Sequence, residues 1–455
     1  MFVGREKELK QLQKALGQNK KDIILIYGKR RVGKTTLIKK ASESFDGRII
    51  FFEGIKAKSS VNLKRLALAI ATAYSEPEFR FSSYKQAFDY LNSKKERKLI
   101  MIDEYPDLKA FEDSQTVDSM FREICDGLDE NTKLVFAGSH VKMMKSLLEE
   151  DNPLFGRFTL SIKLEEFNYL EASLLYDKTA DPRKKVEFYS VFGGLPYLCS
   201  LVDTTQTIRT NIEELLIPQN GQARLYIENV LSQELSSISY GETILSLIGN
   251  TKMRFSEIES RIGGNTNGGL ARQLKYLLDM EIIRKVSPIN KPDDKKKTYY
   301  EISNNLVRFY YTYLAPFAGR NNLLSEQAYY DDFIEKSILQ FTSYRFEDIV
   351  NQYFTIQSRT GKRKGILNIG RYWYDNRKNH KNGEFDCVLE TESGHEVYEI
   401  KFLSSPLTQQ QCEEEAEKIN QIPDIKPSKI GFVSISGFSF ESDEYMLVLG
   451  NKLYC

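Results

Sequence analysis

The sequence predicts an α/β protein of several domains, with a parallel β-sheet near its N-terminus. Short apolar runs that end in polar or glycine-rich loops recur in the first third of the chain, with helical periodicity between them. This is the pattern of buried parallel strands joined by helices. The chain has 455 residues, more than one ordinary hydrophobic core organises, so about two to four domains are expected.

The composition describes a globular protein of balanced charge. Hydrophobic residues make up 41% and charged residues 28% of the chain. No run approaches the ~18 apolar residues of a membrane helix, and the polar N-terminus has no signal-peptide pattern. The five cysteines form no CxxC pair, which argues against a zinc ribbon or a disulfide framework. We therefore expect a cytoplasmic protein with no membrane partner.

The formal net charge of +1 excludes a polycation. Any surface that binds nucleic acid must then be a local basic patch.

The first candidate site is a glycine-rich loop between a strand and a helix. The apolar run Ile23–Tyr27 precedes the sequence GKRRVGKT, residues 28–35. The glycines let backbone N–H groups face phosphates, and Lys34 would reach the β- and γ-phosphates. Thr35 would hold Mg²⁺, so ATP and Mg²⁺ are the expected cofactors. The residues expected around the phosphates are Gly28, Lys29, Arg30, Arg31, Val32, Gly33, Lys34, Thr35 and Thr36.

Two further apolar runs end in polar residues that complete this site. RKLIMIDEYPDL ends in Asp103, expected to bind Mg²⁺ through water, and Glu104, expected to polarise the attacking water. KLVFAGSH ends in Ser139 and His140. Ser139 is either a sensor of the γ-phosphate or the cap of a helix that starts at Val141.

Six motifs occur in an order that resembles one family. They are FVGREKEL at 2–9, the glycine-rich loop, IDEYPD, AGSH, NPLFGRF at 152–158 and GGLPYL at 193–198. Over about the first 320 residues the chain resembles the AAA+/STAND-type predicted ATPases of archaea and bacteria.

The resemblance assigns further residues to the nucleotide site. It implies that Val3, Gly4 and Arg5 border the adenine together with Pro196 of the GxP motif. It also implies that Arg157 senses the γ-phosphate, either within its own subunit or as a finger toward a neighbour in a homo-oligomer. The other interpretation of Arg157 is an ion pair that holds the following loop.

The middle of the chain predicts a helical segment and then a winged helix in outline. The third helix of that outline, Asn267 to Met280, carries Arg272 and Lys275. The wing strands would be Ile283–Val286 and Thr298–Ile302. The tip between them holds Lys291, Lys295, Lys296 and Lys297, partly offset by Asp293 and Asp294. Either the helix and wing bind DNA, or the domain is a lid or a protein-docking surface.

The C-terminal third predicts a second α/β domain. Its order, α, β, β, β, α, β, is typical of restriction endonucleases. Twelve residues separate Asp386 from Glu399-Ile400-Lys401, which resembles the D-x(n)-ExK core of PD-(D/E)XK nucleases, although Phe385 replaces the usual proline. Glu399 and Lys401 share a strand face, and an antiparallel neighbour can bring Asp386 against them.

These residue types suit phosphodiester cleavage. The carboxylates of Asp386 and Glu399 would hold Mg²⁺, Lys401 would orient the attacking water, and Glu347 on the preceding helix would be an extra acid. The alternative is a plain hairpin with acid–lysine pairs. Basic residues that could seat a phosphate backbone lie nearby: Arg359, Lys362, Arg363, Lys364, Arg371, Arg377, Lys378 and Lys381.

The sequence thus predicts a P-loop NTPase parallel sheet, a helical lid, a winged helix and a restriction-endonuclease-like α/β domain. The boundaries are 1–160, 161–236, 237–320 and 321–455. The expected function is ATP-gated, Mg²⁺-dependent cleavage of DNA. The alternative is a signalling or scaffold ATPase, or a DNA-binding regulator, whose C-terminal fold is catalytically silent.

Overall fold

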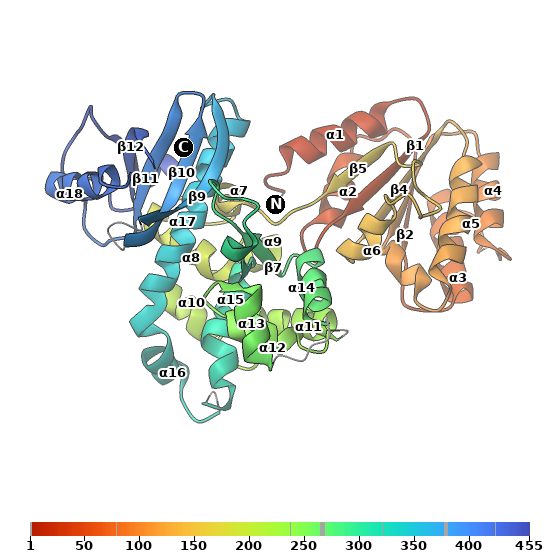
Figure 1. Cartoon of the computed structure of the whole chain (residues 1–455). Helices are drawn as coiled ribbons and strands as arrows, with labels where there is room; N and C mark the ends of the chain where they lie inside the picture. Colours follow the sequence, from red (N-terminus) through yellow and green to blue (C-terminus); the bar gives the residue numbers. More distant parts are fainter. Residues whose placement is uncertain are drawn as a thin grey trace. The chain divides into compact units, whose positions relative to one another are not determined.

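The computed structural model describes residues 2–78, 80–236, 238–263, 269–320, 322–376, 381–423 and 425–455. The chain forms two compact units, Met1–Glu166 and Phe167–Cys455, and Figure 1 shows the elements of each. No helix in the described ranges is long and apolar enough to cross a membrane.

The first unit is built on a parallel sheet, as predicted. The strand order is β2-β3-β4-β1-β5, and all neighbours run parallel. Because the strands are parallel, their carboxyl ends meet at one edge of the sheet, where the polar residues after β1, β3 and β4 gather. The strands are β1 (Asp22–Tyr27), β2 (Arg48–Glu53), β3 (Lys98–Asp103), β4 (Thr132–Gly138) and β5 (Leu160–Lys163).

Helices cover this sheet. Apolar side chains of α3, α4 and α5 share one buried cluster with β1 to β4, while α1 contacts α2. The helical elements are α1 (Glu6–Gly17), α2 (Lys34–Ser42), α3 (Ser59–Tyr74), α4 (Tyr84–Ser93), the 3₁₀ turn Tyr105–Lys109, α5 (Ser114–Asp126) and α6 (Val141–Ser146).

The second unit begins with helices and continues into a small helix–hairpin unit. The order α12, β6, α13, α14, β7, β8 and the antiparallel sheet β6-β8-β7 follow the outline expected from the sequence. The described part of the third helix starts at Gly269, because residues 267 and 268 of the expected span lie outside the described ranges. The elements are α7 (Tyr169–Ser173), α8 (Pro182–Phe192), α9 (Pro196–Cys199), α10 (Ile208–Leu215), α11 (Gln222–Leu235), α12 (Gly241–Ile248), β6 (Met253–Arg254), α13 (Phe255–Ile262), α14 (Gly269–Asp279), β7 (Ile283–Val286) and β8 (Tyr299–Ile302).

The C-terminal part of this unit is a mixed sheet between two helices. The sheet order is β13-β12-β11-β10-β9, antiparallel from β9 to β11 and parallel from β11 to β13. Phe354 of α17 packs on Tyr398 with ring centroids 4.5 Å apart, whereas Ile419 of α18 packs with Val397. Because neighbouring strand residues face opposite sides, α17 and α18 cover opposite faces of the sheet.

This architecture confirms the predicted α/β domain and adds one strand, β13, at its end. The elements are α15 (Asn305–Phe309), the π turn Tyr310–Leu314, the 3₁₀ turn Ala315–Arg320, α16 (Glu326–Phe333), α17 (Glu335–Arg359), β9 (Ile366–Asn376), β10 (Lys381–Thr391), β11 (Gly394–Lys401), α18 (Gln409–Asn420), β12 (Pro427–Ser434), β13 (Met446–Leu449) and the 3₁₀ turn Gly450–Tyr454.

Candidate functional site

The glycine-rich loop joins β1 to α2 at the carboxyl edge of the first sheet. Gly28 has φ +155°, and a Cβ there would lie 2.2 Å from the carbonyl oxygen of Leu164. Gly33 has φ +99° and begins α2. Both positions require glycine, one for close approach and one for its left-handed backbone. The backbone N–H groups at the start of α2 can therefore face an anion.

Lys34 is buried and held at this edge. Its Nζ donates to the carbonyl oxygens of Gly28 and Lys29, at 2.9 and 3.1 Å, and to Oγ of Ser139 at 2.9 Å. Burial lowers the pKa of Lys34, and the nearby carboxylates of Glu104 and Asp103 partly oppose that shift. A phosphate group that replaces these neutral acceptors would favour the charged amine.

Thr35 and Asp103 present two oxygen atoms to the same edge. Thr35 Oγ1 donates to Asp103 Oδ2 at 2.6 Å, and Asp103 Oδ1 accepts from the N–H of Glu104 at 3.1 Å. A hydroxyl beside a carboxylate is a hard-oxygen donor set that suits Mg²⁺. The residues present thus fit the predicted ion.

Ser139 links Lys34 to Glu104. The N–H of Ser139 donates to Glu104 Oε2 at 2.9 Å, and its hydroxyl bonds Glu104 Oε1. Glu104 has φ +49°, a strained backbone for a non-glycine residue. His140 Nδ1 accepts from the N–H of Met143 at 3.2 Å and caps α6, so the capping alternative for Ser139 is wrong.

The N-terminal segment reaches the same unit's last residues. Gly4 and Arg5 have positive φ, and the Arg5 guanidinium donates to the carbonyl oxygen of Glu165. Lys29 pairs with Glu166 at 2.8 Å. The loop and the segment containing Val3 and Arg5 are thus both tied to residues just beyond β5. Pro196 belongs to the second unit and starts α9, so its role beside adenine stays a prediction.

Arg157 is not brought to the nucleotide loop. It pairs with Asp126 at the end of α5, at 3.3 Å, with side chains 36% and 55% exposed. Thr159 meets Ile23 at the start of β1, so Arg157 lies near the amino edge of the sheet, roughly 16 Å from the loop at the other end of the strand. This placement favours the ion-pair interpretation over sensing within its own subunit, and a role toward a neighbouring copy stays a prediction.

The second candidate site is an acidic cluster in the mixed sheet. The register pairs Cys387 with Tyr398, which carries Asp386 opposite Glu399. Asp386 sits at an irregularity between Phe385 and Val388 on the β9 side, a bulge that re-aims side chains. Lys401 Nζ lies 2.7 Å from Glu399 Oε1. Glu399 and Lys401 thus share the face of the sheet that α18 covers, and Asp386 lies beside Glu399 at the bulge.

Glu347 reaches this cluster from α17 and is bound by an arginine. Arg371 Nη2 on β9 lies 2.7 Å from Glu347 Oε2. Burial raises the pKa of Glu347 to about 8, with Asp386 adding to the shift. Burial and the charge of Glu399 raise the pKa of Asp386 to about 6. These carboxylates repel one another and are positioned to be neutralised by a cation or a proton.

The described residues do not form a complete set of metal ligands at this cluster. Within those ranges no three acidic, histidine or cysteine side chains are grouped to hold one metal ion. Asp386 and Glu399 alone offer the two carboxylates predicted for Mg²⁺. No sequence pattern indicated that Arg371 pairs with Glu347, because this contact depends on how β9 packs against α17.

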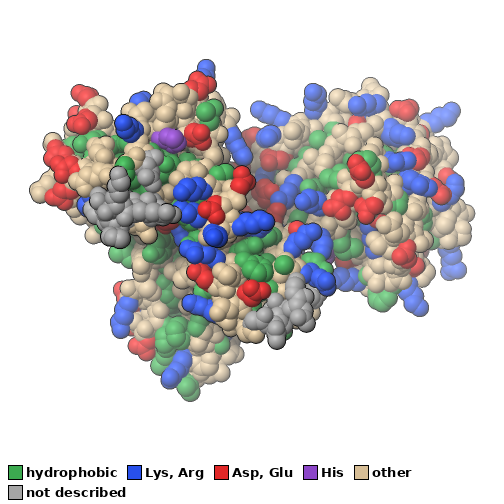
Figure 2. All heavy atoms as spheres, in the orientation of Figure 1, with side chains coloured by type: hydrophobic (Ala, Val, Ile, Leu, Met, Phe, Trp, Pro, Cys, Tyr) green, Lys and Arg blue, Asp and Glu red, His purple; other side chains and the backbone are tan. Residues whose placement is uncertain are grey.

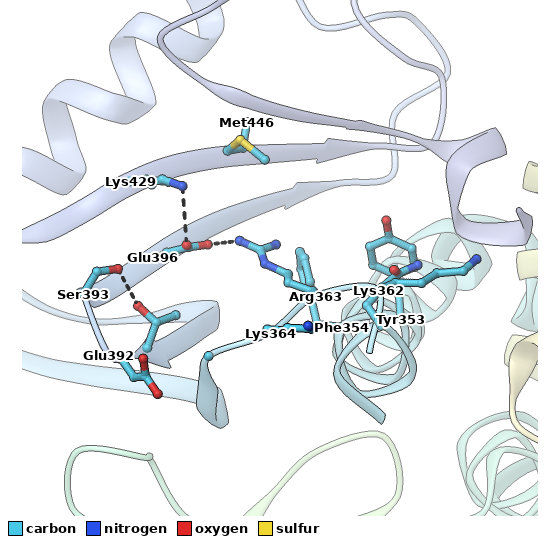
Figure 3. Close-up of a pocket in the computed structure, with 13 residues that line it drawn as sticks. Tyr353, Phe354, Lys362, Arg363, Lys364, Glu392, Ser393, Glu396, Lys429 and Met446 are labelled. Atoms are coloured by element: carbon cyan, nitrogen blue, oxygen red, sulfur yellow. Dashed lines mark hydrogen bonds and ion pairs between the residues drawn. The ribbon is translucent and has the colours of Figure 1, made fainter. Parts of the chain in front are cut away.

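A pocket of ≈ 560 Å³ lies at the other end of this domain (Figure 3). Arg363 points to Glu396 and donates to the hydroxyl of Tyr398 at 2.8 Å. Lys429 Nζ lies 4.0 Å from the other Glu396 oxygen. Two members of the predicted phosphate-seating group, Arg363 and Arg371, are thus paired with carboxylates. Arg377 and Lys378, and the side chain of Lys381, lie outside what the structure describes.

Two family models match parts of this chain. Residues 2–202 match the model of an ATPase domain found predominantly in Archaea. Residues 310–419 match a family described as archaeal and bacterial proteins of unknown function.

Individual proteins also match this chain. An uncharacterised protein of Methanocaldococcus jannaschii, MJECL04, is 27% identical over 393 residues, covering 85% of this chain and 84% of its own. A second protein of that organism, the uncharacterised ATP-binding protein MJ0423, is 52% identical over 44 residues, which are 10% of this chain and 75% of its own. The Walker-type ATPase PABY2304 of Pyrococcus abyssi shares the fold, with a TM-score of 0.50, 18% identity and coverage of 68% of this chain and 96% of its own.

Proposed function

We propose that the nucleotide cycle of the first unit controls a DNA-directed activity of the second unit. The matches of residues 2–202 to an ATPase domain and of residues 310–419 to a family of unknown function support this proposal. The observation that carries the proposal is the convergence of Glu347, Asp386, Glu399 and Lys401. These residues come from α17, β10 and β11, and burial and mutual repulsion raise the pKa values of two of them. Such perturbed groups are characteristic of functional sites.

In the first unit each residue of the site has its own proposed role toward ATP. The loop N–H groups and Lys34 would bind the phosphates, and Thr35 and Asp103 would hold Mg²⁺, which would neutralise phosphate charge when bound. Glu104 orients the attacking water. In the structure Ser139 bonds both Lys34 and Glu104. A γ-phosphate that engages Lys34 and Ser139 would compete with those bonds and release Glu104 for the water.

In the second unit Asp386 and Glu399 would hold a Mg²⁺ ion, whose chemistry is to polarise a phosphodiester. Lys401, fixed by Glu399 at 2.7 Å, orients the attacking water. Glu347 is the extra acid, positioned by Arg371. Duplex DNA is the proposed substrate, because the helix–hairpin unit beside this domain presents exposed lysines at its wing.

One observation favours a second candidate, a scaffold or regulatory ATPase with a silent C-terminal fold. Two of the three acidic side chains at this site pair with an internal cation: Glu347 pairs with Arg371, and Glu399 pairs with Lys401. An acidic cluster balanced this way can be purely structural.

Cleavage of labelled single-stranded, duplex and branched DNA distinguishes the two. The assay uses Mg²⁺ or Mn²⁺, with and without ATP, on the wild type, on Asp386→Ala and on a control, Glu390→Ala, from the same strand. Cleavage by the wild type and the control, lost in Asp386→Ala, supports the nuclease. Absence of cleavage by protein that binds ATP supports the scaffold function.

A further inference from the structure

The segment between β7 and β8, residues 287–298 and here called the wing, is docked on the C-terminal sheet. The N–H of Ile289 donates to the carbonyl oxygen of Arg371 at 2.8 Å. Asn290 Nδ2 donates to the carbonyl oxygen of Trp373 at 2.9 Å, and the N–H of Trp373 donates to Asn290 Oδ1 at 3.4 Å. Because β9 is the last strand of its sheet, the wing satisfies groups that an edge strand leaves open.

Side chains tighten this contact. The rings of Tyr299 and Trp373 meet edge to face, with centroids 5.0 Å apart. Lys252 Nζ lies 5.0 Å from the Trp373 ring centroid and 2.6 Å from Glu384 Oε2. Gly370 leaves room for the wing, since a Cβ there would lie 2.7 Å from Cγ2 of Ile289. The wing itself thus contacts β9, while Lys252, just before β6, reaches β10.

Charged groups beneath the wing join its strands to α17. Arg284 of β7 lies 2.7 Å from Asp348 Oδ1 and 2.6 Å from Glu301 Oε1 of β8. Asp348 also pairs with Arg345 at 2.7 Å, and Glu301 lies 3.6 Å from the buried Arg308. Pulling the hairpin away would leave buried charges unpaired, which is the costliest way to break an ion pair. The hairpin is therefore fixed on the C-terminal domain.

The tip of the docked wing is cationic and exposed. Asp294 caps the 3₁₀ turn Lys295–Lys297 by accepting from the N–H of Lys296 at 2.9 Å, so one acid of the tip serves to build the turn. Lys291, Lys295 and Lys296 are exposed, and within the described ranges none of them has an ion-pair partner. Figure 2 shows Lys and Arg side chains gathered around the position that β7 and β9 have in Figure 1.

The docking fixes the tip relative to the acidic cluster. Arg371 accepts the wing's hydrogen bond through its carbonyl and directs its guanidinium to Glu347. Lys291 is two residues from Ile289, so its backbone lies on the order of 10 Å from that of Arg371. Duplex DNA carries a phosphate charge about every 1.7 Å of its axis. One duplex can therefore contact the lysines of the wing tip and lie beside the acidic cluster at the same time.

We propose that the wing is a fixed part of the DNA-binding surface of the C-terminal domain. Its lysines hold the phosphate backbone of duplex DNA while the wing stays docked on β9. This inference rests on the proposed DNA-directed function and specifies its substrate surface. It differs from an independent winged helix, in which the third helix binds DNA and the wing moves freely.

The first test neutralises the tip of the full chain. Duplex DNA binding is measured by fluorescence anisotropy in EDTA, so that cleavage does not enter. The triple variant Lys291→Ala, Lys295→Ala, Lys296→Ala should bind on the order of ten-fold more weakly at 0.1 M salt, with the slope of log K against log salt reduced by about 2 to 3. The matched control is Arg272→Ala with Lys275→Ala on α14. Binding lost only in this control would overturn the proposal.

The second test locks the wing to the sheet. In Ile289→Cys with Gly370→Cys the two Cβ atoms would lie at most about 4.2 Å apart, within disulfide range. The oxidised protein should bind the duplex within two-fold of the same protein reduced by dithiothreitol. Binding lost on oxidation and restored by reduction would show that the wing must leave β9 and would overturn the proposal.

The outcomes separate this proposal from the proposed function. Wild-type protein that binds no duplex refutes the DNA-directed function as a whole. Wild-type protein that binds and cleaves DNA, with the triple variant binding equally well, refutes only the wing.

Discussion

Glu301→Gln should destabilise the second unit strongly. Glu301 is 2% exposed and lies between Arg284 and Arg308, of which Arg308 is 1% exposed. Burial raises the pKa of Glu301, but the charges of Arg284 and Arg308 outweigh it and leave that pKa below its ordinary value. Burial already lowers the pKa of Arg308 to about 9, so removing its nearest carboxylate leaves a cation without full compensation.

The expected loss follows from this geometry. Removing one partner of a buried ion pair costs about 3–5 kcal/mol, and Arg284 keeps Asp348 at 2.7 Å, which places the loss near the lower value. The pKa of Glu301 is lower in the folded than in the unfolded protein. The charged carboxylate therefore stabilises the fold at any pH above the unfolded pKa, and this stabilisation is lost as the pH falls through the folded pKa. The difference between wild type and variant should therefore be full at pH 7 and shrink in acid.

Urea unfolding followed by tryptophan fluorescence measures this loss. Trp373 is the only tryptophan of the chain, so its signal reports the second unit alone. The control is Glu441→Gln, at an exposed position of the same unit, which should change the free energy of unfolding by less than about 0.5 kcal/mol. A loss below about 1 kcal/mol for Glu301→Gln would refute the buried network as the anchor of the hairpin.

Three other predictions concern the two candidate sites. Lys34→Ala should abolish ATP binding measured by calorimetry, and unchanged affinity would remove Lys34 from the site. Burial and the charge of Glu399 raise the pKa of Asp386 to about 6, so the charged carboxylate destabilises the folded protein as the pH rises from the unfolded pKa of Asp386 through 6. Asp386→Asn should therefore unfold at a higher urea concentration than the wild type at pH 8 and at the same concentration as the wild type at pH 4. Equal urea midpoints at pH 8 would contradict the acidic cluster. Arg157→Ala should change the free energy of unfolding by less than about 1 kcal/mol, since the ion pair between Arg157 and Asp126 is largely exposed. If this substitution lowers the ATPase rate only at high protein concentration, Arg157 acts on the nucleotide of a neighbouring copy.

The nucleotide site was largely predictable because a parallel sheet brings distant residues together by rule. Lys34, Asp103 and Ser139 each follow an apolar run, and the carboxyl ends of parallel strands share one edge. Their meeting needed no knowledge of side-chain packing. No such rule predicts the position of Arg157. It does not follow the carboxyl end of a strand, and it pairs with Asp126 near the amino edge of the sheet.

The acidic cluster was predictable only in part. Strand period and hairpin pairing place Asp386, Glu399 and Lys401 together. The bulge at Asp386, the pairing of Arg371 with Glu347 and the docking of Ile289 on β9 depend on contacts between residues 13 to 82 positions apart. Local sequence patterns carry no information on such contacts, which arise from packing.

The most direct test of the account is the rate of duplex DNA cleavage with and without ATP, in the wild type and in Lys34→Ala. The account predicts that ATP changes the rate in the wild type and leaves the Lys34→Ala rate unaltered. Cleavage that proceeds at one rate in all four conditions would contradict control of the second unit by the nucleotide site of the first.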